Sequence, residues 1–135
     1  MTAIVIDASV SASWLLPDET NSFASEIFEN RSSCQIYVPA IWDYEIRNML
    51  ITNERRSRIS VQAADAAFAF LSELGLVTDR AADWTRVTAL SRQFSLTVYD
   101  AAYLELADRL DLGLATFDKA LISAADRLGR LARQH

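Results

Sequence analysis

Residues 4–9 read Ile4-Val5-Ile6-Asp7-Ala8-Ser9. Three consecutive β-favouring apolar residues predict a strand that is buried on both faces, as strands inside a parallel sheet are. A carboxylate follows directly, and Ser9 then begins a segment with helical character. A charge at the end of a buried strand either caps the next helix or binds a charged group. These six residues leave both interpretations open for Asp7.

The composition favours a helix-rich domain. The chain has 135 residues, 51% of them hydrophobic, with only three Gly and two Pro. It is therefore too apolar for a disordered chain and too poor in turn residues for a β-sandwich. This length fits one domain with a sizeable core, so we expect residues 1–135 to form a single domain.

Several classes of site are excluded by what the chain lacks. Cys34 is the only cysteine, which rules out an internal disulfide and fits a reducing cytoplasm. His135 is the only histidine, which leaves no His-based zinc site and no Ser-His-Asp triad. No apolar run approaches the roughly 20 residues of a membrane span, and no signal-peptide pattern is present. We therefore expect a cytoplasmic protein without membrane contact, whose catalysis, if any, is carried by carboxylates.

The net charge argues mildly against a protein that coats nucleic acid, because the formal sum is -5. It does not exclude a nucleic-acid enzyme. Acidic side chains that surround divalent cations count as negative in this sum, yet they are neutralised in the working protein.

Apolar runs alternate with helical segments along the chain. Strands are expected at residues 4–6, 34–38, 76–78 and 113–116. Helices are expected at residues 9–16, 21–30, 40–54, 60–74 (Ser60 as N-cap, Gly75 as the stop), 81–93, 97–110 and 118–128. Strands separated by helical crossovers pair in parallel. The pattern predicts an α/β fold with a short parallel sheet flanked by helices.

Two acids follow expected strands. In sheets of this kind, ligands bind outside the carboxyl ends of the strands. Asp7 comes after the first strand, and Asp118 comes after the strand at 113–116. Each also stands at the start of a helix, so an N-cap is the structural alternative for both.

Two further acids lie on expected helices. Glu45 is at the edge of an apolar stripe in the helix 40–54, with Asn48 as its neighbour on the helix surface. An exposed glutamate at a stripe edge is the alternative. On the helix 97–110, Asp100 falls within a broad apolar face, roughly 20° from Ala107, whereas the other charged residues of that helix lie outside this face. The apolar members are Tyr99, Tyr103, Leu104, Leu106, Ala107 and Leu110, and the charged residues outside the face are Glu105, Asp108 and Arg109.

A buried acid is costly unless it is paired or binds a metal, although the helix dipole offers another explanation for Asp100. Four converging carboxylates without cations would repel each other. Oxygen ligands without His or Cys point to Mg²⁺ or Mn²⁺, and such sites usually process phosphate esters. Three neutral polar residues adjoin these acids and either orient water and phosphate or act as local caps: Ser9, Asn48 and Thr116.

Four segments in order resemble the PIN-domain family, and in particular the VapC-type toxins of bacterial VapBC toxin–antitoxin pairs. They are Ile6-Asp7-Ala8-Ser9-Val10 with Trp14-Leu15-Leu16-Pro17-Asp18-Glu19, Glu45-Ile46-Arg47-Asn48, Tyr99-Asp100-Ala101-Ala102-Tyr103-Leu104-Glu105-Leu106-Ala107, and Ala115-Thr116-Phe117-Asp118-Lys119. The resemblance spans nearly the whole chain. It implies a PIN-like three-layer α/β/α fold.

The resemblance also implies a function. The family's members are Mg²⁺- or Mn²⁺-dependent endoribonucleases that hydrolyse RNA phosphodiesters with a metal-activated water. By this resemblance, Asp7 and Asp100 are the principal metal ligands, and Glu45 and Asp118 complete the acidic cluster. The implied partners are RNA, a VapB-like cognate antitoxin and a second copy of the chain, within a larger toxin–antitoxin hetero-oligomer.

The sequence departs from the family at two places. Ser57 stands where relatives often have Gly, and the residues after Leu128 lack the apolar strand that often closes the sheet. Two alternatives within the fold remain: a degenerate protein that only binds antitoxin, and a housekeeping PIN nuclease. A haloacid-type phosphatase needs a second Asp where Ser9 stands. A receiver domain needs an acidic pair after the first strand, which Asp7-Ala8 does not supply.

Overall fold

The computed structural model describes residues 2–133, so His135 lies outside the described residues. Four strands form one parallel sheet in the order β3-β2-β1-β4. They are β1 (Ala3–Ile6), β2 (Gln35–Pro39), β3 (Val77–Asp79) and β4 (Leu114–Ala115). β1 lies inside the sheet, and its last three residues are at most 1% exposed. The prediction of a first strand buried on both faces is therefore confirmed.

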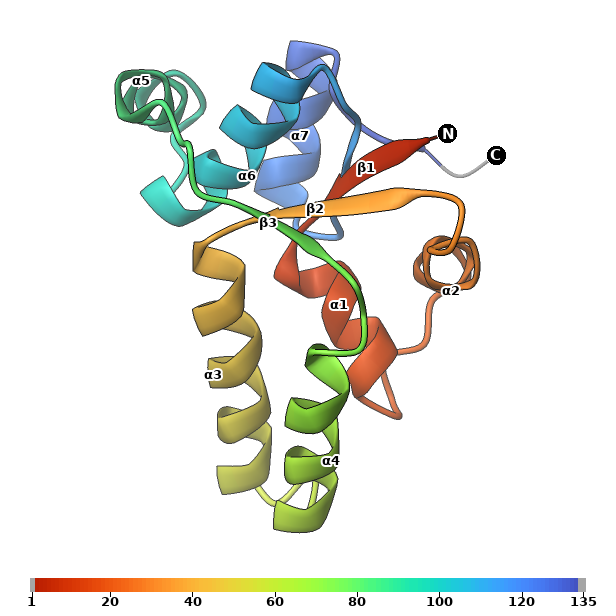
Figure 1. The fold of residues 1–135 in the computed structure, drawn as a ribbon. Coiled ribbons are helices and arrows are strands. Elements are labelled where there is room, and N and C mark those ends of the chain that lie inside the picture. Colours follow the sequence, from red (N-terminus) through yellow and green to blue (C-terminus); the bar gives the residue numbers. More distant parts are fainter. Residues whose placement is uncertain (1, 134–135) are drawn as a thin grey trace.

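Helices cover both faces of this sheet. They are α1 (Ala8–Leu15), α2 (Ser22–Glu29), α3 (Ile41–Arg55), α4 (Val61–Leu71), α5 (Trp84–Phe94), α6 (Val98–Leu110) and α7 (Lys119–Leu128). In Figure 1, α1, α3 and α4 lie on one side of the sheet, and α6 and α7 lie on the other. This arrangement confirms the expected three-layer α/β/α fold. Within residues 2–133, no helix is both long enough and apolar enough to cross a bilayer.

Side-chain N-caps set most of the helix starts. The Asp118 carboxylate accepts a hydrogen bond from the Leu121 amide, and Ser60 Oγ accepts one from the Ala63 amide. Each satisfies one of the backbone N–H groups that a helix start leaves without a partner. The predicted cap at Ser60 is confirmed, and Asp118 is an N-cap, which the sequence had left open as the structural alternative.

Two predicted helix boundaries were wrong. α4 ends at Leu71 rather than Leu74, because the next residues form a tight turn that brings Leu74 into the core. α5 begins at Trp84 rather than near residue 81, because Asp83 caps it and the preceding residues form a loop. In both places a local turn, which helical periodicity does not reveal, replaces helix.

The last edge of the sheet carries one bridge rather than a strand. α7 ends at Gly129, whose φ of +75° lies in the left-handed region. Leu131 then forms an isolated parallel bridge with Leu114, and the Ala132 amide donates to the Leu114 carbonyl over 2.9 Å. Among the described residues, the sheet therefore ends in a single bridge beside β4.

The end of α3 explains the departure at Ser57. Ser57 has a φ of +57°, and its amide donates to the Glu54 carbonyl while the Arg58 amide donates to the Asn53 carbonyl. This is the Schellman arrangement, in which glycine is preferred at the left-handed position. A side chain there costs about 1–2 kcal/mol relative to a right-handed conformation.

Ser57→Gly is expected to stabilise the protein by about 0.5–1 kcal/mol, because glycine removes this strain while losing more backbone entropy. Urea unfolding measures the change. Ser72→Gly is the matched control, since Ser72 caps α4 with a φ of −69°. An equal gain in both variants would contradict the strain explanation.

Candidate functional site

Asp7 lies at the carboxyl end of β1 and is 5% exposed. Its Oδ1 accepts hydrogen bonds from Ser9 Oγ over 2.6 Å and from the Val10 amide over 3.2 Å, and its Oδ2 accepts one from Thr116 Oγ1 over 2.5 Å. Asp7 is therefore the N-cap of α1. The three donors also hold both carboxylate oxygens in one orientation, which a cap alone does not need.

Two hydroxyl groups tie the turn after β4 to Asp7. Ser9 Oγ accepts a hydrogen bond from the Phe117 amide over 3.0 Å, and Thr116 Oγ1 accepts one from the Asp118 amide over 3.1 Å. The structure thus places Ser9 and Thr116 at Asp7, as expected for polar residues that support this acid. Asp118 is exposed, and it caps α7.

Glu45 reaches the same region from α3. It is half-buried, and the hydroxyl of Tyr103 on α6 donates a hydrogen bond to its Oε1 over 2.6 Å. Asn48 is exposed, and within residues 2–133 it has no hydrogen bond to any of the four acids. The structure therefore brings Glu45 toward α6 but leaves Asn48 at the helix surface.

The burial pattern predicted for α6 was wrong in part. Asp100 is half-buried in the first helical turn, and the Thr97 side chain caps the helix by accepting from its amide. Tyr99, placed on the apolar face, is 58% exposed, whereas Glu105, placed outside it, is 1% exposed. Glu105 is buried because it is paired: its Oε1 accepts from Arg109 Nε over 2.7 Å.

Electrostatic interactions connect the four acids. Burial raises the pKa of Asp7, Glu45 and Asp100 above the ordinary value. The charges of Asp100 and Asp7 raise the pKa of Glu45 further, and the charge of Asp118 raises that of Asp100. Burial, the hydrogen bond to Glu45, and the charges of Glu45, Asp7 and Asp100 also raise the pKa of the Tyr103 phenol. The acids therefore form one linked negative cluster, which we call the acidic cluster: Asp7, Glu45, Asp100 and Asp118.

Among the described residues, no basic side chain forms an ion pair with the acidic cluster. The ion pairs among residues 2–133 use other acids, namely Asp43, Asp79, Glu105, Asp108, Asp111 and Asp126. Repulsion between unpaired carboxylates destabilises their charged forms, and a bound cation would offset it.

The donor set fits a hard divalent cation, since all the ligands offered are carboxylate oxygens. Among residues 2–133, no three acidic, His or Cys side chains already converge as a metal site. The four acids thus interact electrostatically with one another, but their oxygen atoms are not arranged around a common metal position. Within residues 2–133, Tyr103 donates to Oε1 of Glu45 and no donor reaches its Oε2, whereas the Asp100 carboxylate has a side-chain hydrogen bond with Thr97.

Tyr103 is the site residue that sequence reasoning missed. It was assigned to the apolar face of its helix, and it is indeed 1% exposed. The available signal was its position three residues after Asp100, which places both residues on neighbouring parts of the helix surface. Spacing within the helix does not indicate that its hydroxyl meets Glu45, because the partners are 58 residues apart.

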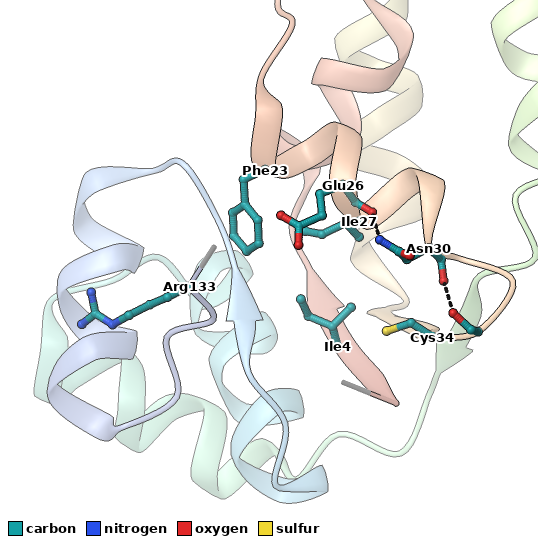
Figure 2. Close-up of a pocket in the computed structure, with 8 residues that line it drawn as sticks. Ile4, Phe23, Glu26, Ile27, Asn30, Cys34 and Arg133 are labelled. Carbon is teal, nitrogen blue, oxygen red and sulfur yellow. Dashed lines mark hydrogen bonds between the residues drawn. The ribbon is translucent and has the colours of Figure 1, made fainter. Parts of the chain in front are cut away.

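A pocket of about 230 Å³ lies at the opposite end of the sheet, where β1 and β2 begin (Figure 2). Ile4, Phe23 and Cys34 are among the residues that line it. Burial raises the pKa of the Cys34 thiol, which disfavours the reactive thiolate. Of the described residues that line this pocket, Glu26 alone carries a carboxylate, so they offer no equivalent of the acidic cluster.

The comparison with protein families matches this architecture. The family model for the PIN domain covers residues 4–127. The chain therefore belongs to the PIN-domain family. It is similar to ribonuclease VapC3 of Mycobacterium tuberculosis, in strains CDC 1551 / Oshkosh and H37Rv, with 30% identity over 121 residues. The match covers 90% of this chain and 86% of VapC3.

Solved structures share the fold. PAE2754 from Pyrobaculum aerophilum superposes with a TM-score of 0.70 and 21% identity, over 91% of this chain and 79% of that one. FitAcB from Neisseria gonorrhoeae superposes with a TM-score of 0.61 and 19% sequence identity, and the match covers 91% of this chain and 93% of that one. Mycobacterium tuberculosis VapC20, described as a sarcin–ricin loop cleaving toxin, superposes with a TM-score of 0.65 and 14% sequence identity. This match covers 90% of this chain and 94% of that one.

Proposed function

We propose that this protein is a metal-dependent endoribonuclease and the toxin of a type II toxin–antitoxin pair, with the whole chain acting as one nuclease domain. The observation that carries the proposal is the acidic cluster, which has no basic partner among the described residues and lies where β1 and β4 end. The kinship to a relative named a ribonuclease supports the choice of RNA as substrate.

Each acid has a proposed task. Asp7 and Asp100 hold Mg²⁺ or Mn²⁺, and Glu45 and Asp118 complete the cluster, directly or through water. Such a cation, when bound, polarises the phosphate and makes water a better nucleophile. Ser9 and Thr116 keep the Asp7 carboxylate in a fixed orientation through their hydroxyl groups. Asn48 lies on the same helix as Glu45, and from there it would contact the RNA rather than the metal ligands.

The partners are proposed on the same basis. We expect a VapB-like antitoxin, a homodimer and a larger toxin–antitoxin assembly in the cytoplasm. Tyr44 and Trp84 are large apolar residues that are 74% and 65% exposed. Exposed aromatic residues of this kind are enriched at protein interfaces, which supports a partner surface at α3 and α5.

Metal removal tests the proposed function. Purified protein is expected to cleave RNA with Mn²⁺ or Mg²⁺, to lose this activity in EDTA, and to regain it with excess Mn²⁺. Gel analysis of the RNA, with end-group mapping for a 3′-hydroxyl and a 5′-phosphate, measures the reaction. Cleavage that survives EDTA would contradict the metal mechanism. Tight antitoxin binding without cleavage of any RNA would favour the degenerate, antitoxin-binding alternative.

A further inference from the structure

Tyr103 joins two helices at the acidic cluster. Its hydroxyl donates to Glu45 Oε1 over 2.6 Å, so α6 and α3 are connected by a side-chain bond between residues far apart in sequence. Tyr103 stands three residues after Asp100, on the same part of α6. The side chain is 1% exposed and belongs to the hydrophobic core. The core therefore fixes the position of its hydroxyl.

The Glu45 carboxylate is held by different hydrogen bonds from those of Asp7 and Asp118. Asp7 accepts three hydrogen bonds, and Asp118 accepts one from the backbone of its own helix. Within residues 2–133, Tyr103 provides the one hydrogen bond to the Glu45 carboxylate, and no ion pair holds it. A glutamate has three rotatable side-chain bonds, so without this contact its carboxylate would sample several positions.

The chemistry of the donor matters as much as its position. A phenol is a neutral donor, so it orients the carboxylate without cancelling its negative charge. It donates to Oε1, and no other residue in the described part of the chain donates a hydrogen bond to Oε2. A Lys or Arg at the same place would neutralise Glu45 and weaken its attraction for a cation.

From this geometry we propose that Tyr103 is a positioning residue, which holds the Glu45 carboxylate toward Asp7 and Asp100 so that it can bind the divalent cation. The inference rests on the proposed function, because it assigns Tyr103 a task in that same acidic cluster. Partners that orient metal ligands typically change metal affinity by 10–100-fold when they are removed.

Tyr103→Phe tests the inference, since it removes only the hydroxyl and keeps the ring in the core. Titration calorimetry with Mn²⁺ measures affinity on wild type, Tyr103→Phe, Glu45→Gln and the double variant. We expect the Mn²⁺ dissociation constant of Tyr103→Phe to rise about tenfold. In the Glu45→Gln background, adding Tyr103→Phe should change the Mn²⁺ dissociation constant by less than about twofold, because the hydroxyl acts through the Glu45 carboxylate.

Tyr37→Phe is the matched control. The Tyr37 hydroxyl donates to Gln35 Oε1 on β2 over 3.0 Å, away from the acidic cluster, so its removal should leave Mn²⁺ affinity unchanged. If folded Tyr103→Phe binds Mn²⁺ with an unchanged dissociation constant, the role of Tyr103 is overturned while the proposed function stands. A tenfold loss of Mn²⁺ affinity that Tyr103→Phe still causes in the Glu45→Gln background also overturns it, because Tyr103 then has a general structural role. A wild-type protein that does not bind Mn²⁺ overturns the proposed function as well.

Discussion

Asp100→Asn is expected to lower RNA cleavage by about a thousandfold or more while the protein stays folded. The substitution keeps the size of the side chain but removes a charge from the acidic cluster. A metal ion contributes several kcal/mol to charge stabilisation in such reactions, and each 1.4 kcal/mol corresponds to a factor of ten in rate. Asp7→Asn should have a similar effect, because asparagine can still cap α1.

The rate should be measured at saturating Mn²⁺ with a fluorogenic single-stranded RNA, and folding should be followed by circular dichroism. Asp43→Asn is the matched control, since Asp43 is a first-turn helical acid like Asp100 but is paired with Arg47. It should retain nearly full activity. A folded Asp100→Asn variant that cleaves RNA at the wild-type rate would remove Asp100 from the proposed metal site.

Arg109→Met is expected to destabilise the protein by about 3 kcal/mol, which lowers Tm by roughly 10 °C. Arg109 Nε binds Glu105 over 2.7 Å, and its Nη2 binds Asp79 Oδ1 over 2.7 Å, so one guanidinium serves two acids. Removing it leaves the charge of Glu105 buried without its partner. The estimate is at the low end for buried pairs because the Arg109 side chain is partly exposed.

Differential scanning calorimetry measures this loss. Replacing Glu105 by Leu in the Arg109→Met background should restore more than half of the lost stability, because Glu105 then no longer buries an unpaired charge. Arg47→Met, which breaks an exposed pair with Asp43, should cost less than about 1 kcal/mol. An equal loss in the two arginine variants would show that burial of Glu105 is not the cause.

The Arg109 effect should also depend on pH. The hydrogen bond from Arg109 holds the pKa of Asp79 below its ordinary value. A group with a lowered folded-state pKa contributes its full stability above its ordinary pKa and loses it as the pH falls. The stability difference between wild type and Arg109→Met should therefore shrink in acid, from its full value at neutral pH.

The sequence alone determined the parts of the fold that depend on local chemistry. Apolar residues at 4–6 predicted a strand buried on both faces, a polar residue at a helix start predicted the cap at Ser60, and a cap was one of the two interpretations open for Asp118. Strands separated by helices required parallel pairing, and this pairing predicted that Asp7 and Asp118 lie at the same edge of the sheet. All of these follow from hydrogen-bonding needs and chain connectivity, which neighbouring residues largely dictate.

Only the tertiary structure decided which side chains of α6 are buried and which of them meet Glu45. Helical periodicity identifies an apolar stripe, but α6 packs against α5, α7 and three strands. Its residues 101–107 are consequently all buried, and no single stripe exists. A charge such as Glu105 can then enter the interior when Arg109 reaches it, and a tyrosine such as Tyr103 can find a partner 58 residues away. These contacts depend on how separate elements pack, and the spacing within any one element does not contain that information.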